Sequence, residues 1–459
     1  MSQGPDAARA AAFLEGLIRQ QGADFGARAS RALADTTDLL AAMDHPERGL
    51  AVIHIAGSKG KGSTALCCEA ILKAAGLGVG TFTSPHLTRW HERFRLDGSP
   101  VDDATFAATV DAVRPAVADL QRRRDRAPGF FAVVTAAALG LFRRANVDVA
   151  VVETGIGGRR DATNVLTPKV SCITTIEREH VDKLGFTLEA IASEKAGIIK
   201  PEGTAVIGPL LSPAADVVAR HAMACGAPTW ISGRDFTFTA QPLAAGSRLA
   251  VSVPPAGLDP PVELVLPLPG HHLAQNAALA VACVGAFGTR GPDLARAAKA
   301  GLEAVVLPGR SEILSRRPWI VVDSAHTRAS VAALTDVLAP LAVKPRLVVL
   351  SVSRDKDPGP LCHPLVNLAD AVFTTCAEPR RSWSAEALAK ALAETHPPCA
   401  ITPIADPHQA LATALAQLPA PGLLCVAGSV FLAGIARTSL AGDGAAPPLA
   451  RQALSSGSP

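Results

Sequence analysis

A recurring order of elements, in which a strand leads through a loop into a helix, constrains the fold of this chain more than any other feature. Branched apolar runs that predict buried strands lie at residues 50–56, 79–83, 147–153, 170–176 and 205–208. Apolar spacing that predicts helices lies at 7–43, 64–75, 131–142 and 188–199. This alternation favours an α/β fold in which helices cover a mainly parallel sheet.

In the second half of the chain, the pattern of apolar and polar residues changes twice. Alternating patterns and many prolines at 236–267 predict antiparallel strands, and 272–288 predicts a helix. A second alternating region has predicted strands at 319–323, 347–351, 371–374 and 423–427. We therefore predict three parts, at residues 1–304, 305–440 and 441–459, the last being a disordered tail rich in Gly, Pro, Ala and Ser.

Composition excludes several classes of protein. The 459 residues carry a net charge of only +3 and no long basic run, so nucleic-acid binding is not expected. The sequence has no basic and apolar leader, and no run of 18 uncharged apolar residues, so we expect neither secretion nor a membrane span. Nine scattered cysteines predict reduced thiols, which indicates a cytoplasmic protein.

The stretch 53–64 is the sharpest local signal, because a predicted buried strand runs there into a glycine-rich loop that opens a helix. Glycines let backbone amides approach a polyphosphate, and the helix N-terminus adds partial positive charge. Lys61 supplies a cation for the phosphates, and Ser63 or Thr64 supplies a hydroxyl for phosphate or Mg²⁺. The strict phosphate-loop pattern is not met, because Ile55 stands at its first glycine and Gly62 separates Lys61 from Ser63. A glycine-rich turn capped by Ser63 is the alternative.

Polar residues follow three further predicted strands, namely Ser84, Glu153 and His180. The carboxyl ends of parallel strands meet at one sheet edge, so these side chains are candidates for a Mg²⁺ site beside the phosphate loop. A solvated glutamate and a structural histidine are the alternatives. Lys195 lies in a predicted helix with apolar neighbours, and its own sequence context favours an ordinary helix lysine that reaches solvent. Burial would lower its pKa and make it reactive.

Taken together, these motifs resemble the folylpolyglutamate synthase/dihydrofolate synthase family, within the Mur ligase superfamily. The stretches that carry the resemblance, in chain order, are 54–63, 83–87, 92–98, 153–164, 179–185, 194–201, 276–280, 307–310, 323–327, 355–357 and 428–429. They extend over nearly the whole chain. The resemblance implies an N-terminal P-loop ATPase-like domain and a smaller, Rossmann-like C-terminal domain. It also implies that ATP phosphorylates a folate-type carboxylate and that the amine of L-glutamate then displaces the phosphate.

The family pattern also implies roles for individual residues. The residues that it implies in ATP binding are Gly57, Ser58, Lys59, Gly60, Lys61, Gly62, Ser63, Asn276, Arg310 and Asp323. It implies two Mg²⁺ ions, whose protein ligands would be Ser84, Glu153, His180 and a carbamylated Lys195. It gives catalytic roles to Lys61, Lys195 and His326, and places Arg160 and Asp161 beside the acid. A monomer is expected.

The sequence departs from the family pattern at several positions. Ser58 and Lys59 replace the usual Thr and Asn, and Ala132 follows Phe131 where Glu is usual. Ser324 and Arg328 are unusual in the motif that begins at Asp323, and Glu179 replaces an Asp. Two alternative functions therefore stay open. One is a Mur-type amide ligase for a different acid or pterin coenzyme, and the other is a catalytically silent relative that binds nucleotide.

Overall fold

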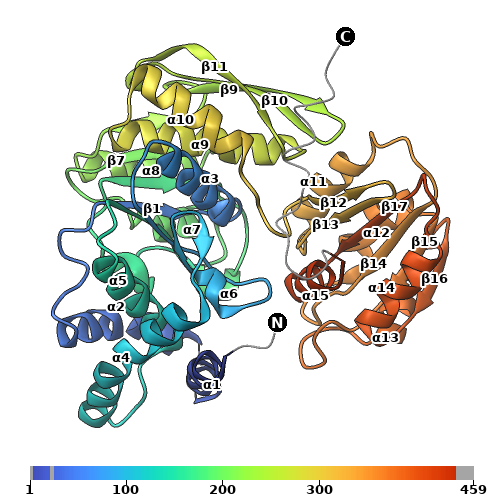
Figure 1. The fold of residues 1–459 in the computed structure, drawn as a ribbon, viewed down its shortest axis with the longest axis horizontal. Helices are drawn as coiled ribbons and strands as arrows, with labels where there is room; N and C mark the ends of the chain where they lie inside the picture. Colours follow the sequence, from blue (N-terminus) through green and yellow to red (C-terminus); the bar gives the residue numbers. More distant parts are fainter. Residues whose placement is uncertain (1–3, 21–24, 441–459) are drawn as a thin grey trace. The chain divides into compact units, whose positions relative to one another are not determined.

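An eight-stranded sheet forms the centre of the larger of two compact units in the computed structural model, which describes residues 4–20 and 25–440 (Figure 1). Its strand order is β4-β3-β2-β5-β1-β6-β7-β8. The strands are β1 (Val52–Ala56), β2 (Val79–Phe82), β3 (Phe94–Leu96), β4 (Ser99–Pro100), β5 (Val149–Glu153), β6 (Val170–Ile173), β7 (Thr204–Ile207) and β8 (Thr229–Ile231). All pairings from β2 to β8 are parallel, which confirms the predicted fold class.

The antiparallel edge was not predicted. Strands β3 and β4 pair antiparallel with their neighbours. They have only three and two residues. Segments this short carry too few residues for an alternating pattern to be recognised, so sequence periodicity gave no signal for them.

Helices complete this unit. They are α1 (Pro5–Gln20), α2 (Phe25–Ala42), α3 (Lys61–Ala74), α4 (Asp103–Arg124), α5 (Phe130–Arg144), α6 (Val181–Leu184), α7 (Leu188–Ala196), α8 (Ala214–Ala224), α9 (His271–Phe287) from residue 275 on, and α10 (Gly291–Glu303). Short 3₁₀ turns lie at Trp90–Arg93, Ala162–Val165 and Pro254–Ala256. Buried apolar residues of α1, α2, α4 and α5 form one core cluster with β2 and β5. A second cluster joins α7 and α8 to β6 and β7. Burial of each large aliphatic side chain contributes about 2 kcal/mol, so these clusters fix the strand ends that carry polar residues.

Strands β9 (Thr237–Leu243), β10 (Gly246–Val253) and β11 (Leu258–Leu266) form a three-stranded sheet in the order β11-β10-β9, in the region predicted to hold further strands. The second unit contains residues 306–440 together with 241–248 and 266–274. The predicted tail at 441–459 lies outside the described residues. The domain boundaries stay a prediction.

The second unit has a six-stranded sheet in the order β12-β13-β17-β14-β15-β16, parallel except for β12. Its elements are β12 (Glu312–Arg316), β13 (Trp319–Val322), α11 (Arg328–Leu338), β14 (Arg346–Leu350), α12 (Pro358–Leu368), β15 (Ala371–Thr374), α13 (Ala385–Ala393), β16 (Ala400–Pro403), α14 (Pro407–Ala416), β17 (Leu423–Ala427) and α15 (Val430–Leu440). No helix within the described residues is long and apolar enough to cross a bilayer. All nine cysteines are free in the structure.

Candidate active site

The loop between β1 and α3 has the geometry of an anion site. The amides of Ser58 and Lys59 already donate to Thr175, at 2.8 Å to its carbonyl and 2.9 Å to its Oγ1. The first turn of α3 begins directly afterwards, at Lys61. First-turn amides have no acceptor within their own helix, so they point out of the N-terminus and can bind phosphate oxygens. Among the predicted ATP contacts, those at Gly60–Ser63 are thus better placed than the backbone of Ser58 and Lys59.

Gly60 is required by the shape of the loop. Its φ of +83° is left-handed, and a Cβ there would lie 2.3 Å from Oδ1 of Asn276. Asn276 is buried, at 4% exposure, on α9. The structure therefore brings together two residues predicted for ATP binding that lie far apart in sequence.

We expect Gly60→Ala to weaken nucleotide binding by at least about tenfold, because the new methyl group must displace Asn276 and deform the loop. Binding of ADP, measured by calorimetry, would detect the loss. Gly76→Ala is a matched control, since Gly76 has a φ of +86° at the other end of α3 but no atom within 4 Å of the place that a Cβ would take. The control should cost about 1 kcal/mol of stability and leave ADP affinity unchanged. Equal affinities for both variants would contradict the role of Gly60.

Three lysine ammonium groups surround the loop. Lys61 Nζ and Lys195 Nζ both donate to the carbonyl of Gly57, at 3.0 and 2.8 Å. Lys195 also pairs with Glu179 at 3.1 Å, and Lys59 pairs with the same carboxylate at 3.2 Å. The sequence did not decide whether Lys195 is buried, and the structure buries it at 1% exposure. The loop thus concentrates positive charge where a polyphosphate would lie.

Burial and neighbouring charges shift the pKa values of the groups in this cluster. Burial is the main cause that lowers the pKa of Lys195 from 10.5 to about 8; Lys61 adds to the shift and Glu179 opposes it. Burial alone would raise the pKa of Glu179, but its three lysine neighbours outweigh that effect and lower it. A lysine with a pKa of about 8 is unprotonated far more often at neutral pH than an ordinary lysine, and the unprotonated form is the one that reacts with electrophiles. The metal-binding role predicted for Lys195 stays a prediction.

Glu153 lies at the end of β5, beside the start of α3. It is 4% exposed, and its Oε2 accepts the amide of Ser84 at 2.9 Å. A Cβ on Gly62 would lie 3.3 Å from the same oxygen, so the carboxylate is next to the phosphate loop. His180 is the residue before α6, with a left-handed φ of +46°, and burial is the main cause that lowers its pKa.

The loop after Glu153 is held together by Asp161. Its Oδ2 accepts the amides of Gly155 and Ile156 at 3.0 and 3.1 Å, and its Oδ1 accepts the amide and hydroxyl of Thr163 at 3.0 and 2.6 Å. These bonds use both carboxylate oxygens within the loop, and burial raises the pKa of the group. Arg160 is half exposed and pairs with Glu194 at 2.9 Å. Contact of Arg160 and Asp161 with the acid substrate stays a prediction.

His54 on β1 connects to this loop. Its Nε2 lies 2.8 Å from Oγ1 of Thr163, and both residues are fully buried. Burial is the main cause that lowers the pKa of His54 from 6.5 to about 3, with Lys200 adding to the shift. The imidazole is therefore neutral at physiological pH.

This shift predicts acid sensitivity. The folded protein holds His54 neutral down to about pH 3, whereas the unfolded chain binds a proton below about pH 6.5. The stabilising contribution is therefore complete above pH 6.5 and is lost as the pH falls through this window. Between about pH 7.5 and about pH 5 the loss should be about 2 kcal/mol. Thermal unfolding of the wild type and of His54→Gln at both pH values would measure it; an equal loss in the variant would contradict the assignment to His54.

The second unit gathers the remaining predicted residues. Asp323, at 7% exposure, accepts the amide of Ser311 at 2.5 Å and that of Ala325 at 2.6 Å. Arg310 donates to the carbonyl of Gly309 at 3.0 Å and hydrogen-bonds to the Ser324 hydroxyl. Nδ1 of His326 lies 2.8 Å from the carbonyl of Ser324, a contact that requires a proton on Nδ1. Arg310, Asp323 and His326 therefore share one turn region around β13.

Comparisons with known proteins place this arrangement in a family. The model of the Mur ligase middle domain matches residues 131–284, and that of the Mur ligase glutamate ligase domain matches residues 309–430. A dihydrofolate synthase/folylpolyglutamate synthase from Mycobacterium tuberculosis is 34% identical over 446 residues, which cover 91% of both chains. The chain belongs to the folylpolyglutamate synthase/dihydrofolate synthase family of Mur ligases.

Two further relatives of this family support the assignment. The solved structure of Mycobacterium tuberculosis folylpolyglutamate synthase complexed with ADP matches this chain with a TM-score of 0.86 at 34% identity, and the match covers 96% of this chain and 100% of that one. A probable bifunctional folylpolyglutamate synthase/dihydropteroate synthase from Halobacterium salinarum is 38% identical over 405 residues. These residues make up 88% of this chain but 49% of that relative, so the chain spans about half of its length.

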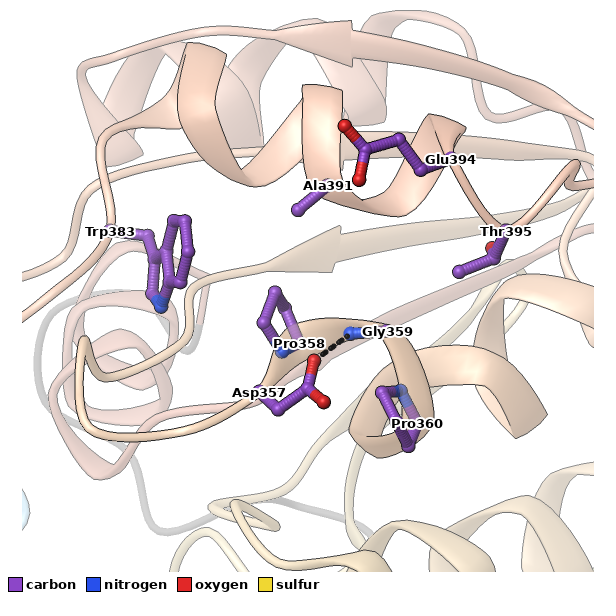
Figure 2. A pocket seen from close by; sticks show the side chains of 8 residues that line it. All are labelled: Asp357, Pro358, Gly359, Pro360, Trp383, Ala391, Glu394 and Thr395. Atoms are coloured by element: carbon purple, nitrogen blue, oxygen red, sulfur yellow. Dashed lines mark hydrogen bonds between the residues drawn. The ribbon is translucent and has the colours of Figure 1, made fainter.

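A separate cavity of about 520 Å³ opens in the second unit, at the start of α12 (Figure 2). The residues that line it are Asp357, Pro358, Gly359, Pro360, Trp383, Ala391, Glu394 and Thr395. Figure 2 shows Asp357 turned toward the amide of Gly359, which donates to it at 3.3 Å. None of the predicted site residues lines this cavity. We therefore do not assign it to the family's reaction.

Sequence reasoning missed Arg93 as a site neighbour. It is 8% exposed, its guanidinium carbon lies 5.3 Å from the Trp90 ring centre and 5.6 Å from that of Phe130, and its Nε donates to His86 at 2.9 Å. Burial is the main cause that lowers its pKa to about 10, although Glu153 opposes the shift. Arg93 belongs to the matching stretch 92–98, but only the folded structure places its charge near Glu153.

Proposed function

We propose that this chain is an ATP-dependent ligase that joins L-glutamate to a folate-type carboxylate and releases ADP and phosphate. Membership of the folylpolyglutamate synthase/dihydrofolate synthase family supports the substrate class. The observation that carries the ATP-dependent chemistry is the convergence of Lys61 and Lys195 on the Gly57 carbonyl at the start of α3. This cluster offers the ammonium group of Lys61 and a helix N-terminus to one polyphosphate, and it places Lys195 beside them.

The chemistry has two balanced steps. A substrate carboxylate oxygen attacks the γ-phosphorus of ATP, the bond to the β-phosphate oxygen breaks, and an acyl phosphate and ADP form. The glutamate amine then attacks the acyl carbon, loses a proton, and expels inorganic phosphate as the amide forms. A carboxylate is a poor electrophile, so phosphorylation supplies the leaving group. In this chain, Lys61 and the amides of the first turn of α3 would neutralise and orient the phosphates.

The residues at the strand ends fit the Mg²⁺ that the family implies. Within residues 4–20 and 25–440 no three His, Cys, Asp or Glu side chains gather as a metal cage. Mg²⁺ usually takes only one or two carboxylates and completes its shell with water and phosphate oxygens. The buried carboxylate of Glu153 next to Gly62, with Ser84 beside it, supplies such a partial set. When bound, the ion would supply charge to the phosphates; His180 and a carbamylated Lys195 are proposed for a second ion.

The remaining assignments follow the same proposal. Residues 1–304 would bind ATP and residues 305–440 would bind glutamate, with Asn276, Arg310 and Asp323 on the nucleotide and His326 near glutamate. Arg160 and Asp161 would lie near the folate-type acid. We propose a cytoplasmic monomer.

A second candidate, glutamylation of a different acid, is favoured by Ala132. This residue is fully buried and apolar at the position where the family usually has a glutamate, so it offers the acid substrate no polar contact.

Release of ADP by purified protein, with Mg²⁺, ATP and glutamate, tests both candidates when dihydropteroate is compared with tetrahydrofolate as acceptor. We expect ADP release that requires both glutamate and one of these acids, and the ratio of the two rates assigns the step. If protein that binds ADP releases no ADP with either acid, the folate assignment would be refuted and a different acid substrate would be favoured.

A further inference from the structure

A buried chain of side-chain hydrogen bonds links the strand of the phosphate loop to the loop that follows Glu153. It runs from His54 Nε2 to Thr163 Oγ1 at 2.8 Å, and from Thr163 Oγ1 to Asp161 Oδ1 at 2.6 Å. The three side chains are 0, 0 and 5% exposed. Solvent therefore cannot replace these bonds if one partner is lost.

The chain of bonds fixes one tautomer of His54. The single hydroxyl proton of Thr163 is used toward the Asp161 carboxylate, so Thr163 accepts from His54, whose proton must lie on Nε2. Nδ1 of His54 is then an acceptor, and it is buried with no hydrogen-bond partner among the residues that the structure describes. A buried orphan acceptor costs free energy, so packing alone would favour an apolar residue at this place.

The loop that these hydrogen bonds hold, residues 155–164, lies between Glu153 and Lys195, the two residues proposed to act at the phosphates. At its start, next to Glu153, Asp161 fixes the amides of Gly155 and Ile156. At its end, Asn164 Nδ2 donates to the carbonyl of Gly197 at 3.2 Å, directly after α7. In the middle, a Cβ on Gly158 would lie only 2.9 Å from the carbonyl oxygen of Lys195, so loop and helix are in backbone contact. A shift of this loop would therefore move Glu153 relative to Lys195.

We propose that His54 is a positioning residue for the ligase reaction, which rests on the proposed function. As a neutral imidazole, His54 donates from Nε2 to Thr163, and Thr163 and Asp161 hold the loop 155–164 in the shape that sets Glu153 and Lys195. His54 itself does not touch the reacting groups in this proposal.

Two substitutions at His54 separate positioning from general stability. His54→Gln keeps an N–H donor at the place of Nε2, whereas His54→Asn is too short to reach Thr163. We expect kcat to fall about 10- to 100-fold in His54→Asn and to stay within about threefold of wild type in His54→Gln. The affinity for ADP should stay within about twofold in both, because the amides of Gly60–Ser63 do not belong to this chain of bonds.

Thr163→Val, which keeps the side-chain shape and removes both bonds, provides a second test that does not depend on folding of the Asn variant. It should lower kcat like His54→Asn, and the double variant should be no worse than either single one. Three results would overturn the positioning role: equal kcat in the Asn and Gln variants, wild-type kcat in Thr163→Val, or a parallel loss of ADP affinity and kcat. Inactivity of the wild type toward every acid would instead refute the proposed function, and this role with it.

Discussion

Replacing Lys61 by alanine should lower turnover by about a hundred- to a thousandfold while the protein stays folded. Lys61 is the first residue of α3, and its ammonium group already points back to the Gly57 carbonyl within the loop. Charge that develops on the transferred phosphate would lose its nearest mobile cation, and electrostatic groups of this kind typically contribute factors of that size. Steady-state release of ADP measures the effect.

Lys73→Ala is the matched control for this experiment. Lys73 lies in the last turn of the same helix and is exposed, so its loss removes an equal charge far from the loop. Turnover of the control should stay within about twofold of wild type. Wild-type turnover in Lys61→Ala would contradict the phosphate-binding role. If the chain were a silent relative, neither variant nor wild type would release ADP.

Replacing Glu153 by glutamine should lower turnover by at least about a hundredfold and raise the concentration of Mg²⁺ that half-saturates the reaction. The substitution keeps the shape of the side chain, including an oxygen that can accept the Ser84 amide, but removes the negative charge beside Gly62. A neutral amide is a poor ligand for Mg²⁺. The substitution also removes one of the two carboxylates, the other being Glu92, that favour the charged form of the nearby buried Arg93. Initial rates over a range of Mg²⁺ concentrations measure both effects.

Glu69→Gln tests whether such a loss is merely structural. Glu69 is equally buried, at 2% exposure, and it pairs with Arg95 at 2.9 Å, about two helical turns along α3 from Gly62. Its substitution should lower the melting temperature and leave the Mg²⁺ dependence unchanged. A shift in Mg²⁺ dependence shared by both variants would show that Glu153 has no specific part in binding the ion.

The sequence predicted strands β1, β2, β5, β6 and β7 and the phosphate loop because their signals are local, whereas it missed the short strands β3, β4 and β8. Each apolar run that marks β1, β5 or β6 lies within a few residues, and the glycines and lysines of 57–62 are adjacent. The order of strands in the sheet, with β1 between β5 and β6, has no such local signal. It depends on pairings between distant segments.

The same distinction between local signals and contacts between distant segments explains which features of the candidate site the sequence did not reveal. His54 reads in the sequence as one polar residue in an apolar strand, and its partner Thr163 is 109 positions away. The burial of Lys195 depends on Gly57, 138 positions earlier in the chain. Helical spacing alone could not distinguish a buried lysine from one that reaches solvent. Asp161 was predicted to lie beside the acid substrate, a role that stays a prediction, and its four hydrogen bonds within the loop were visible only after folding.

Mass spectrometry of the acid after incubation with Mg²⁺, ATP and L-glutamate tests the proposed ligase most directly. We predict that dihydropteroate or tetrahydrofolate gains one glutamyl residue for each ADP released, and that Lys61→Ala forms this product about a hundred- to a thousandfold more slowly. Release of ADP without any glutamylated acid, or formation of the product without ATP, would contradict the proposal that this chain couples phosphoryl transfer to amide formation.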